Sequence, residues 1–301
     1  MAAVAATLAF CAGCGAGRGG GSAGERMASG WDLYRLGEFS LALKDFEAVA
    51  QGAEPGSSNH LAALYAQATT WSLRRPEEDK VRAERLYREV IALAPTNDLA
   101  AWSWLALARM KAAPVGGEIP PLPPQVEAYQ EVIDRFPSHP AAEEAFFHQQ
   151  AARLEQPDEA RTREVLAALE TFLGTRPQSP WRSTAYGLVG HCCAVLGLKD
   201  RRLEAAFEAF RSAEVNPATP PSARDMSTFY WQVATLAEFE TGDFDMAREY
   251  YRKFITEYPR EQRVFVARQE LKRMDELEAE ISGQWAVGSG QESPPPEKGA
   301  R

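Results

Sequence analysis

Side chains that could carry out catalysis are few in this sequence and stand far apart. The four histidines, His60, His139, His148 and His191, form no H-E-x-x-H motif and no spacing typical of metal ligands. Glu144 and His148 are four residues apart and would share one helix face, as in half of a di-iron site. A second Glu-x-x-His copy, which such a site requires, is absent, so we expect a surface pair. The sequence therefore predicts no metal site and no cofactor.

A second candidate for chemistry is the run His191-Cys192-Cys193, in which thiols stand beside an imidazole. Neighbouring residues on a helix point about 100° apart, so adjacent members of this run do not face one another. Free cysteine also behaves as a small hydrophobic residue. We therefore expect Cys192 and Cys193 to be buried in a packed helix, and we expect no enzyme. The alternatives are a degenerate enzyme that uses the Cys192 region, or an accessory domain of a cell-envelope enzyme.

A glycine-rich stretch near the N-terminus has the letters of a nucleotide-binding motif. GAGRGGGSAG, from Gly15 to Gly24, satisfies G-x-G-x-x-G at Gly15, Gly17 and Gly20. A dinucleotide site needs these glycines between a buried strand and a helix, and no strand can precede residue 15. We therefore interpret residues 14–26 as a flexible tether.

The residues before this tether are small and apolar, MAAVAATLAFCAGC, and are too few to span a bilayer. They read as the core of an export signal, residues 1–13. Ala12-Gly13-Cys14 resembles the lipobox of bacterial lipoproteins, although no Lys or Arg precedes the apolar run and Cys11 stands where Leu is usual. The resemblance implies lipidation of Cys14 and a location in the cell envelope, on the outer rather than the inner membrane, facing the periplasm. The alternatives are an ordinary signal peptide and a cytosolic adaptor with a disordered N-terminus.

Composition limits the class of partner and of fold. The chain has 301 residues, of which 45% are hydrophobic and 25% charged, with a formal net charge of −9 and a pI near 5.2. Nucleic acids and anionic lipid surfaces demand a basic patch, so we expect neither as the main partner. Alanine far outnumbers valine and isoleucine, which favours helices over strands.

A repeated pattern predicts the architecture. In residues 228–259 the key residues are Trp231, Gly242, Phe244, Ala247, Tyr251, Phe254 and Pro259. Counted from Thr228 they occupy positions 4, 15, 17, 20, 24, 27 and 32, which resembles the tetratricopeptide repeat of about 34 residues in a helix-turn-helix. Gly37, Phe39, Ala42, Phe46 and Val49 repeat the middle of this spacing residue for residue.

Weaker copies between these two predict six helix pairs. We expect second helices near residues 40–50, 80–93, 125–135, 160–173, 201–214 and 244–257, and first helices that carry Trp31, Trp71, Trp102, Phe146, Tyr186 and Trp231. The predicted fold is all-α, a right-handed α-solenoid of about six such units over residues 27–281, ended by a capping helix. A proline-rich stretch, 113–125, should form an extended loop, and residues 282–301 a disordered tail.

The resemblance also implies a concave groove, because positions 2, 5, 9 and 12 of each tetratricopeptide unit face it. Carried onto this sequence, the groove candidates are Trp31, Tyr34, Ser103, Leu107, Phe229, Gln232, Leu236 and Phe239. Such an apolar and aromatic lining suits an extended or helical peptide of a partner protein. Most aromatic residues at repeat spacing, however, simply fill the space between helices.

Taken with the export signal, the repeats are similar to those of outer-membrane lipoproteins of the BamD/ComL type or the YbgF type of the Tol-Pal system. The resemblance implies a scaffold that binds partner proteins, in outer-membrane protein assembly or envelope maintenance. It implies contact with the membrane through the lipid anchor only.

Overall fold

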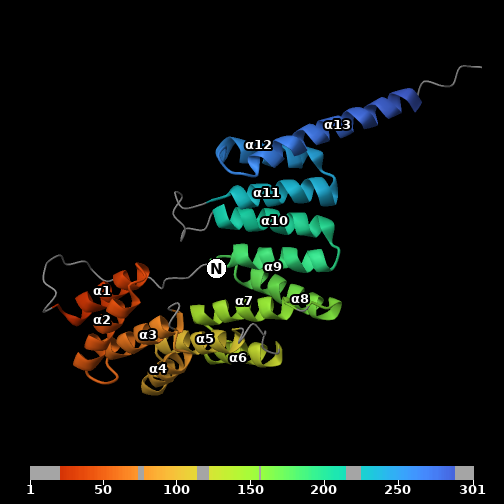
Figure 1. Cartoon of the computed structure of the whole chain (residues 1–301). Helices are drawn as coiled ribbons and strands as arrows, with labels where there is room; N and C mark the ends of the chain where they lie inside the picture. Colours follow the sequence, from red (N-terminus) through yellow and green to blue (C-terminus); the bar gives the residue numbers. More distant parts are fainter. Residues whose placement is uncertain (1–20, 74–77, 114–121, 156, 215–224, 289–301) are drawn as a thin grey trace, which may run out of the picture. The chain divides into compact units, whose positions relative to one another are not determined.

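The computed structural model describes residues 21–73, 78–113, 122–155, 157–214 and 225–288, and within these ranges it contains thirteen α-helices and no strand (Figure 1). The chain divides into two compact units, residues 1–153 and 154–301. The helices of the first unit are α1 (Ala23–Arg35), α2 (Phe39–Gly52), α3 (Ser58–Leu73), α4 (Lys80–Leu93), α5 (Asp98–Ala112), α6 (Leu122–Arg135) and α7 (Pro140–Leu154). Those of the second are α8 (Glu159–Thr175), α9 (Arg182–Val195), α10 (Lys199–Glu214), α11 (Ser227–Leu236), the π-helical turn η2 (Ala237–Thr241), α12 (Phe244–Glu257) and α13 (Val264–Gly288).

Helices that follow one another in the sequence pack against one another within each unit, and residues of α5, α6 and α7 share one hydrophobic cluster. In the first unit α1 also contacts α3, and α3 contacts α5, so the first helices of neighbouring pairs are adjacent. This is the packing of an α-solenoid, in which each pair stacks on the next. All six ranges predicted for second helices lie within α2, α4, α6, α8, α10 and α12. The predicted fold class, an all-α tetratricopeptide-like solenoid, is confirmed.

The two best copies of the repeat turn between their helices in the same way. Gly37 and Gly242 stand at repeat position 15 and both have positive φ angles, 81° and 72°. Glycine adopts this left-handed conformation without the steric cost that a Cβ atom would add. One residue later Asp243 caps α12, because its carboxylate accepts a hydrogen bond of 3.0 Å from the backbone N–H of Met246.

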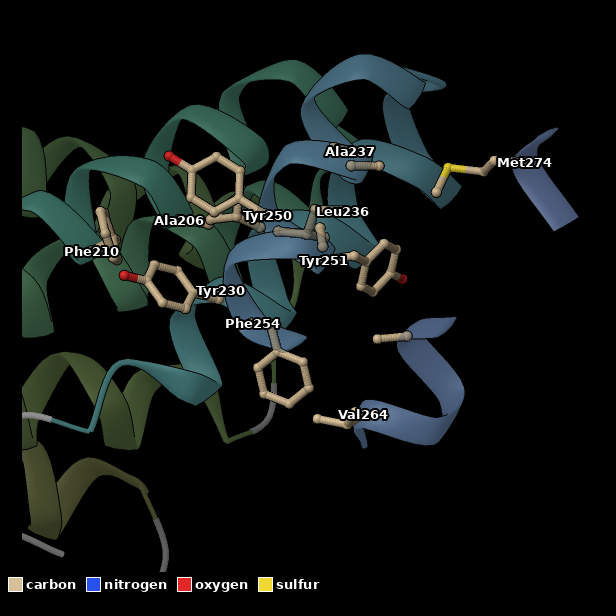
Figure 2. Close-up of a cluster of buried hydrophobic side chains, with 14 residues drawn as sticks. Ala206, Phe210, Tyr230, Leu236, Ala237, Tyr250, Tyr251, Phe254, Val264 and Met274 are labelled. Atoms are coloured by element: carbon tan, nitrogen blue, oxygen red, sulfur yellow. The ribbon is translucent and has the colours of Figure 1, made fainter. Parts of the chain in front are cut away.

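Side chains of α10 to α13 form one hydrophobic core at the C-terminal end of the second unit (Figure 2). Tyr251 and Phe254 of α12 are fully buried. The ring of Trp231 on α11 packs edge-on against both, at centroid distances of 5.6 and 5.8 Å. Met274 of α13 is also fully buried, so α13 covers the side of the last pair that no further pair covers.

The structure moves three boundaries that the sequence placed elsewhere. Helix α1 begins at Ala23, inside the range 14–26 that was predicted as tether, because Ser22 and Glu25 form a capping box. The Ser22 hydroxyl accepts from the Glu25 N–H at 3.3 Å, and the Glu25 carboxylate accepts from the Ser22 N–H at 2.7 Å. Helix α13 continues through Gly288, so residues 282–288 of the predicted tail are helical, and residues 289–301 lie outside the described residues.

The third boundary concerns the proline-rich stretch 113–125. Helix α6 begins at Leu122, so Pro123 and Pro124 occupy its first turn, and Gln125 is buried. The first N–H groups of a helix have no partner within it, so proline is tolerated there. Residues 114–121 lie outside the described residues.

Candidate functional site

The predicted groove residues of the first pair pack within that pair. Trp31 and Tyr34 lie on α1 and are half-buried, with their ring centroids 5.5 Å apart. Trp31 also lies 5.2 Å from the ring of Phe46, and Tyr34 lies 5.4 Å from that of Phe39. Burial raises the pKa of the Tyr34 hydroxyl. Each ring therefore has one face in the core and leaves only part of its surface for a partner.

Three other candidates are core residues, which corrects the prediction for them. Ser103 is fully buried on α5, and its hydroxyl donates a hydrogen bond of 2.7 Å to the carbonyl of Leu99. Leu107 of the same helix packs into a cluster with residues of α3 and α4, and Leu236 belongs to the core of Figure 2. Groove positions of a solenoid are buried where a neighbouring helix covers them, and a single repeat pattern does not say which ones are covered.

The remaining candidates, Phe229, Gln232 and Phe239, lie at the surface of the second unit. Phe229 is half-buried and Gln232 exposed, one turn apart on α11. Phe239 lies in the π-helical turn with 60% of its surface exposed, and the guanidinium of Arg273 lies 5.0 Å from its ring centroid. Of these three, Phe229 and Gln232 line a pocket.

This pocket has a volume of about 190 Å³ and lies between α9, α10 and α11. Its apolar part comes from Ala206 and Ala209 of α10 and from the ring of Phe229. Ser183, Thr184 and Gln232, whose side chains carry neutral hydrogen-bonding groups, also line it. No charged residue lines it among the residues that the structure describes. The pocket therefore offers an uncharged, mainly apolar surface with neutral hydrogen-bonding groups beside it.

Helix α9 contributes three further lining residues, Tyr186, Gly187 and Gly190. Arg182 holds Tyr186 in place, because its guanidinium donates a hydrogen bond of 3.2 Å to the tyrosine hydroxyl and lies 5.4 Å from the ring centroid. The sequence reasoning overlooked the two glycines. Counted back from Pro217 at position 32, they fall at groove positions 2 and 5 of the fifth unit, so the same count would have found them.

A polar cluster of the first unit connects α5, α6 and α7. Glu144 is buried and ion-paired with Arg109, which also donates a hydrogen bond of 3.2 Å to His148. The imidazole stacks on the ring of Tyr129 at a centroid distance of 5.5 Å. The prediction of a surface pair for Glu144 and His148 was therefore wrong for Glu144. Burial, with Arg109 close by, lowers the pKa of His148 to about 4, so the imidazole is neutral at pH 7.

A second buried carboxylate fastens α13 to the last repeat. Glu238 lies in the π-helical turn and accepts a hydrogen bond of 2.8 Å from the hydroxyl of Tyr251. Arg273 of α13 forms an ion pair with the same carboxylate. Burial raises the pKa of Glu238, although Tyr251 and Arg273 oppose the shift. The arrangement compensates a buried charge and fastens α13 to the last repeat.

The paired cysteines are buried, as the sequence predicted. Cys192 and Cys193 are fully buried on α9. Burial raises the pKa of the Cys192 thiol to about 11 and also raises that of Cys193. Because the thiolate is the nucleophile, both thiols are poorly suited to covalent catalysis.

Neither metal ligation nor membrane crossing is indicated in the part of the chain that the structure describes. No three His, Cys, Asp or Glu side chains within it converge as metal ligands would. None of its helices combines the length and apolarity that crossing a bilayer requires. Cys14, the predicted signal 1–13 and most of the predicted tether lie outside the described residues.

Comparison with known proteins agrees with this geometry. A family model described as a tetratricopeptide repeat matches residues 230–260, which contain most of α11, the π-helical turn and α12. Residues 230–260 are therefore similar to one unit of the tetratricopeptide repeat. A fold of this type is typically a non-catalytic scaffold that binds proteins or peptides. No curated protein matches the chain significantly in sequence.

The crystal structure of PilW extends the likeness from one repeat to the architecture. The crystal structure of PilW, a widely conserved type IV pilus biogenesis factor, is similar with a TM-score of 0.54 and 12% identity, over 84% of this chain and 97% of that one. BtubC from P. vanneervenii gives a TM-score of 0.48 and 16% identity, over 94% and 98% of the two chains. The assembly chaperone of RpL4, Acl4, gives a TM-score of 0.49 and 14% identity, over 87% of this chain and 99% of that one. At 12% identity the likeness to PilW concerns the fold alone.

Proposed function

We propose that this chain is an exported, lipid-anchored scaffold that faces the periplasm and binds a partner protein through its stacked helix pairs. The pocket between α9, α10 and α11 supports the binding half of the proposal, because it is an uncharged hollow at positions that face the groove in tetratricopeptide units. The lipobox-like Ala12-Gly13-Cys14 and the glycine-rich stretch after it support the anchor half. Outer-membrane protein assembly or envelope maintenance is the process that the resemblance to BamD/ComL and YbgF lipoproteins favours.

The anchor is tested by labelling cells that express the chain with radioactive palmitate and then separating their membranes. We expect label in the outer-membrane fraction for the natural sequence and none for Cys14→Ser. Cys11→Ser is the matched control, because this cysteine would be removed with the signal and should leave labelling intact. An unlabelled chain found in the cytosol would contradict the anchor and would favour a cytosolic adaptor.

The binding half is tested separately, by affinity purification of the chain from detergent-solubilised envelopes after brief crosslinking. We expect a specific partner to co-purify with the natural chain and with Cys14→Ser chain added to the extract. Recovery of the same set of proteins with an unrelated helical lipoprotein as bait would contradict specific binding.

A further inference from the structure

Helix α9 contains two glycines at positions where no contact among the described residues requires glycine. Gly187 and Gly190 lie in the middle of Arg182–Val195, where glycine costs roughly 0.5–1 kcal/mol relative to alanine. Apart from its chain neighbours and the backbone of its own helix, no described residue has a heavy atom within 4 Å of the position that a Cβ atom would take on Gly187. At Gly190 the nearest is the Cβ of Ala205 at 3.9 Å, an ordinary contact. Alanine would therefore fit at both positions and would favour the helix.

Gly30, in the first unit, is by contrast a glycine that the packing of the chain requires. A Cβ atom on Gly30 of α1 would lie 2.4 Å from an atom of the Phe46 ring, so the packing of α1 on α2 requires glycine there. Helix-interior glycines without such a neighbour fit sites where a group from outside approaches the backbone closely. Both α9 glycines line the same pocket, which indicates where that group would lie.

Size and charge restrict what the pocket can hold. At about 190 Å³ it is smaller than the roughly 300–1,000 Å³ of small-molecule sites. It exceeds the roughly 150 Å³ of an apolar cavity that is known to bind benzene in another protein. Charge complementarity favours an uncharged occupant, because burial of a charge without a partner is costly and no charged residue lines the pocket among those described. The ring of Phe229 on one wall provides an edge or face for a second aromatic ring.

We propose that this pocket is the anchor site for one aromatic side chain, a phenylalanine or a residue of similar size, presented by an extended segment of a partner protein. The inference rests on the proposed function and makes it more specific. The ring would enter over Gly187 and Gly190 and pack against Phe229. Ser183, Thr184 and Gln232 also line the pocket, and their side chains would exchange hydrogen bonds with the backbone of the same segment.

The probe for the test is N-acetyl-L-phenylalaninamide, with N-acetyl-L-alaninamide and N-acetyl-L-glutamate amide for comparison. Binding to the purified full chain is measured by ligand-observed NMR. We expect saturable, millimolar binding of the phenylalanine derivative and at least tenfold weaker binding of the other two. Equal binding of the glutamate derivative, or no binding of any probe, would overturn the proposal.

A variant that fills the pocket provides the structural control. Gly187→Leu should raise the Kd of the phenylalanine probe at least tenfold and leave the helical circular dichroism unchanged. Gly187→Ala, which the described packing accommodates, should raise the Kd of the probe a few-fold. This variant replaces Gly187→Leu in the test if the leucine variant does not fold. Gly174→Leu is the matched control, because Gly174 on α8 also has open space around its Cβ position but does not line the pocket. Unchanged binding to Gly187→Leu would place the probe elsewhere and overturn the proposal.

Two further measurements distinguish an aromatic side chain of a partner from a segment of the chain itself, and the pocket from the rest of the scaffold. In the first, residues 215–224, which join α10 to α11 in the sequence, are replaced by a Gly-Ser linker of equal length. Binding of the probe only after that replacement would overturn the proposal, because a segment of the chain itself would then be the occupant. Co-purification of envelope partners by Gly187→Leu at the level of the natural chain would leave the proposed scaffold standing and remove the aromatic anchor.

Discussion

His148 shows at the scale of one residue how the packing of three helices sets a protonation state. Its imidazole contacts Arg109 of α5, Glu144 on its own helix and Tyr129 of α6. Burial is the main reason that its pKa falls to about 4, and the positive charge of Arg109 adds to it. The folded chain therefore binds the proton more weakly than the unfolded chain, whose histidine has a pKa of about 6.5.

Stability should consequently fall as the pH drops through the interval between these values. Below about pH 6.5 the unfolded state binds a proton at this histidine, whereas the folded state binds it only near pH 4. The free energy of unfolding therefore decreases over that range. We expect a loss of about 1–2 kcal/mol from this residue, after allowance for the 41% of its side chain that is exposed. Urea unfolding at pH 7, 5.5 and 4 should show a smaller loss for His148→Gln than for the natural chain. The control is His60→Gln, in the same unit but away from the cluster, which should lose as much unfolding free energy as the natural chain. The same dependence of the unfolding free energy on pH in all three proteins would refute the explanation.

Burial also separates the groove candidates of one short segment. Leu236 is 5% exposed and packs in the core of Figure 2, whereas Phe239, three residues later, is 60% exposed. Leu236→Ala should lower the free energy of unfolding by roughly 2–5 kcal/mol, because it leaves a cavity. Phe239→Ala should lower it by less than about 1 kcal/mol, since it removes a largely solvated ring. Chemical denaturation followed by circular dichroism measures both, and similar costs would contradict the burial pattern.

At the scale of a helix, the glycines of α1 and α9 differ in whether the surrounding packing leaves room for a Cβ atom. Gly187→Ala in α9 should raise the unfolding free energy by roughly 0.5–1 kcal/mol, because the helix gains propensity and the new Cβ meets no described atom. Gly30→Ala in α1 should lower it by roughly 1–3 kcal/mol, because the new Cβ overlaps the Phe46 ring. Thermal unfolding of the two variants side by side gives the signs, and a destabilised Gly187→Ala would show that this glycine has a structural reason inside the chain.

The helices themselves were predictable from the sequence to within a few residues. Gly242, Ala247 and Tyr251 of the last unit match Gly37, Ala42 and Phe46 of the first, because both units need a turn, a close approach and a buried ring at these positions. The ends were less predictable. Ser22 and Glu25 extend α1 through a capping box that lies inside a glycine-rich run, and Pro123 and Pro124 begin a helix because its first turn tolerates proline.

The site was predictable only in part, for a reason that belongs to the whole molecule. Repeat positions say which way a side chain points relative to its own helix pair, and two of the residues that they single out, Phe229 and Gln232, line a pocket. Whether the pocket stays open depends on the size of residues in the neighbouring pair. Ser103 is covered, whereas the glycines of α9 leave space in front of Phe229.

The same architecture predicts how far a local defect spreads. Helices contact their sequence neighbours within each unit, so stability in a solenoid is close to a sum over pairs and their interfaces. Phe254 of α12 and Phe46 of α2 are both fully buried, one in each unit. Phe254→Ala, which should cost roughly 3–5 kcal/mol, is expected to speed amide hydrogen exchange in α11, α12 and α13 while α1 to α4 keep their protection. Phe46→Ala should do the reverse. Acceleration of exchange along the whole chain by either variant would instead show that the two units unfold as one cooperative body.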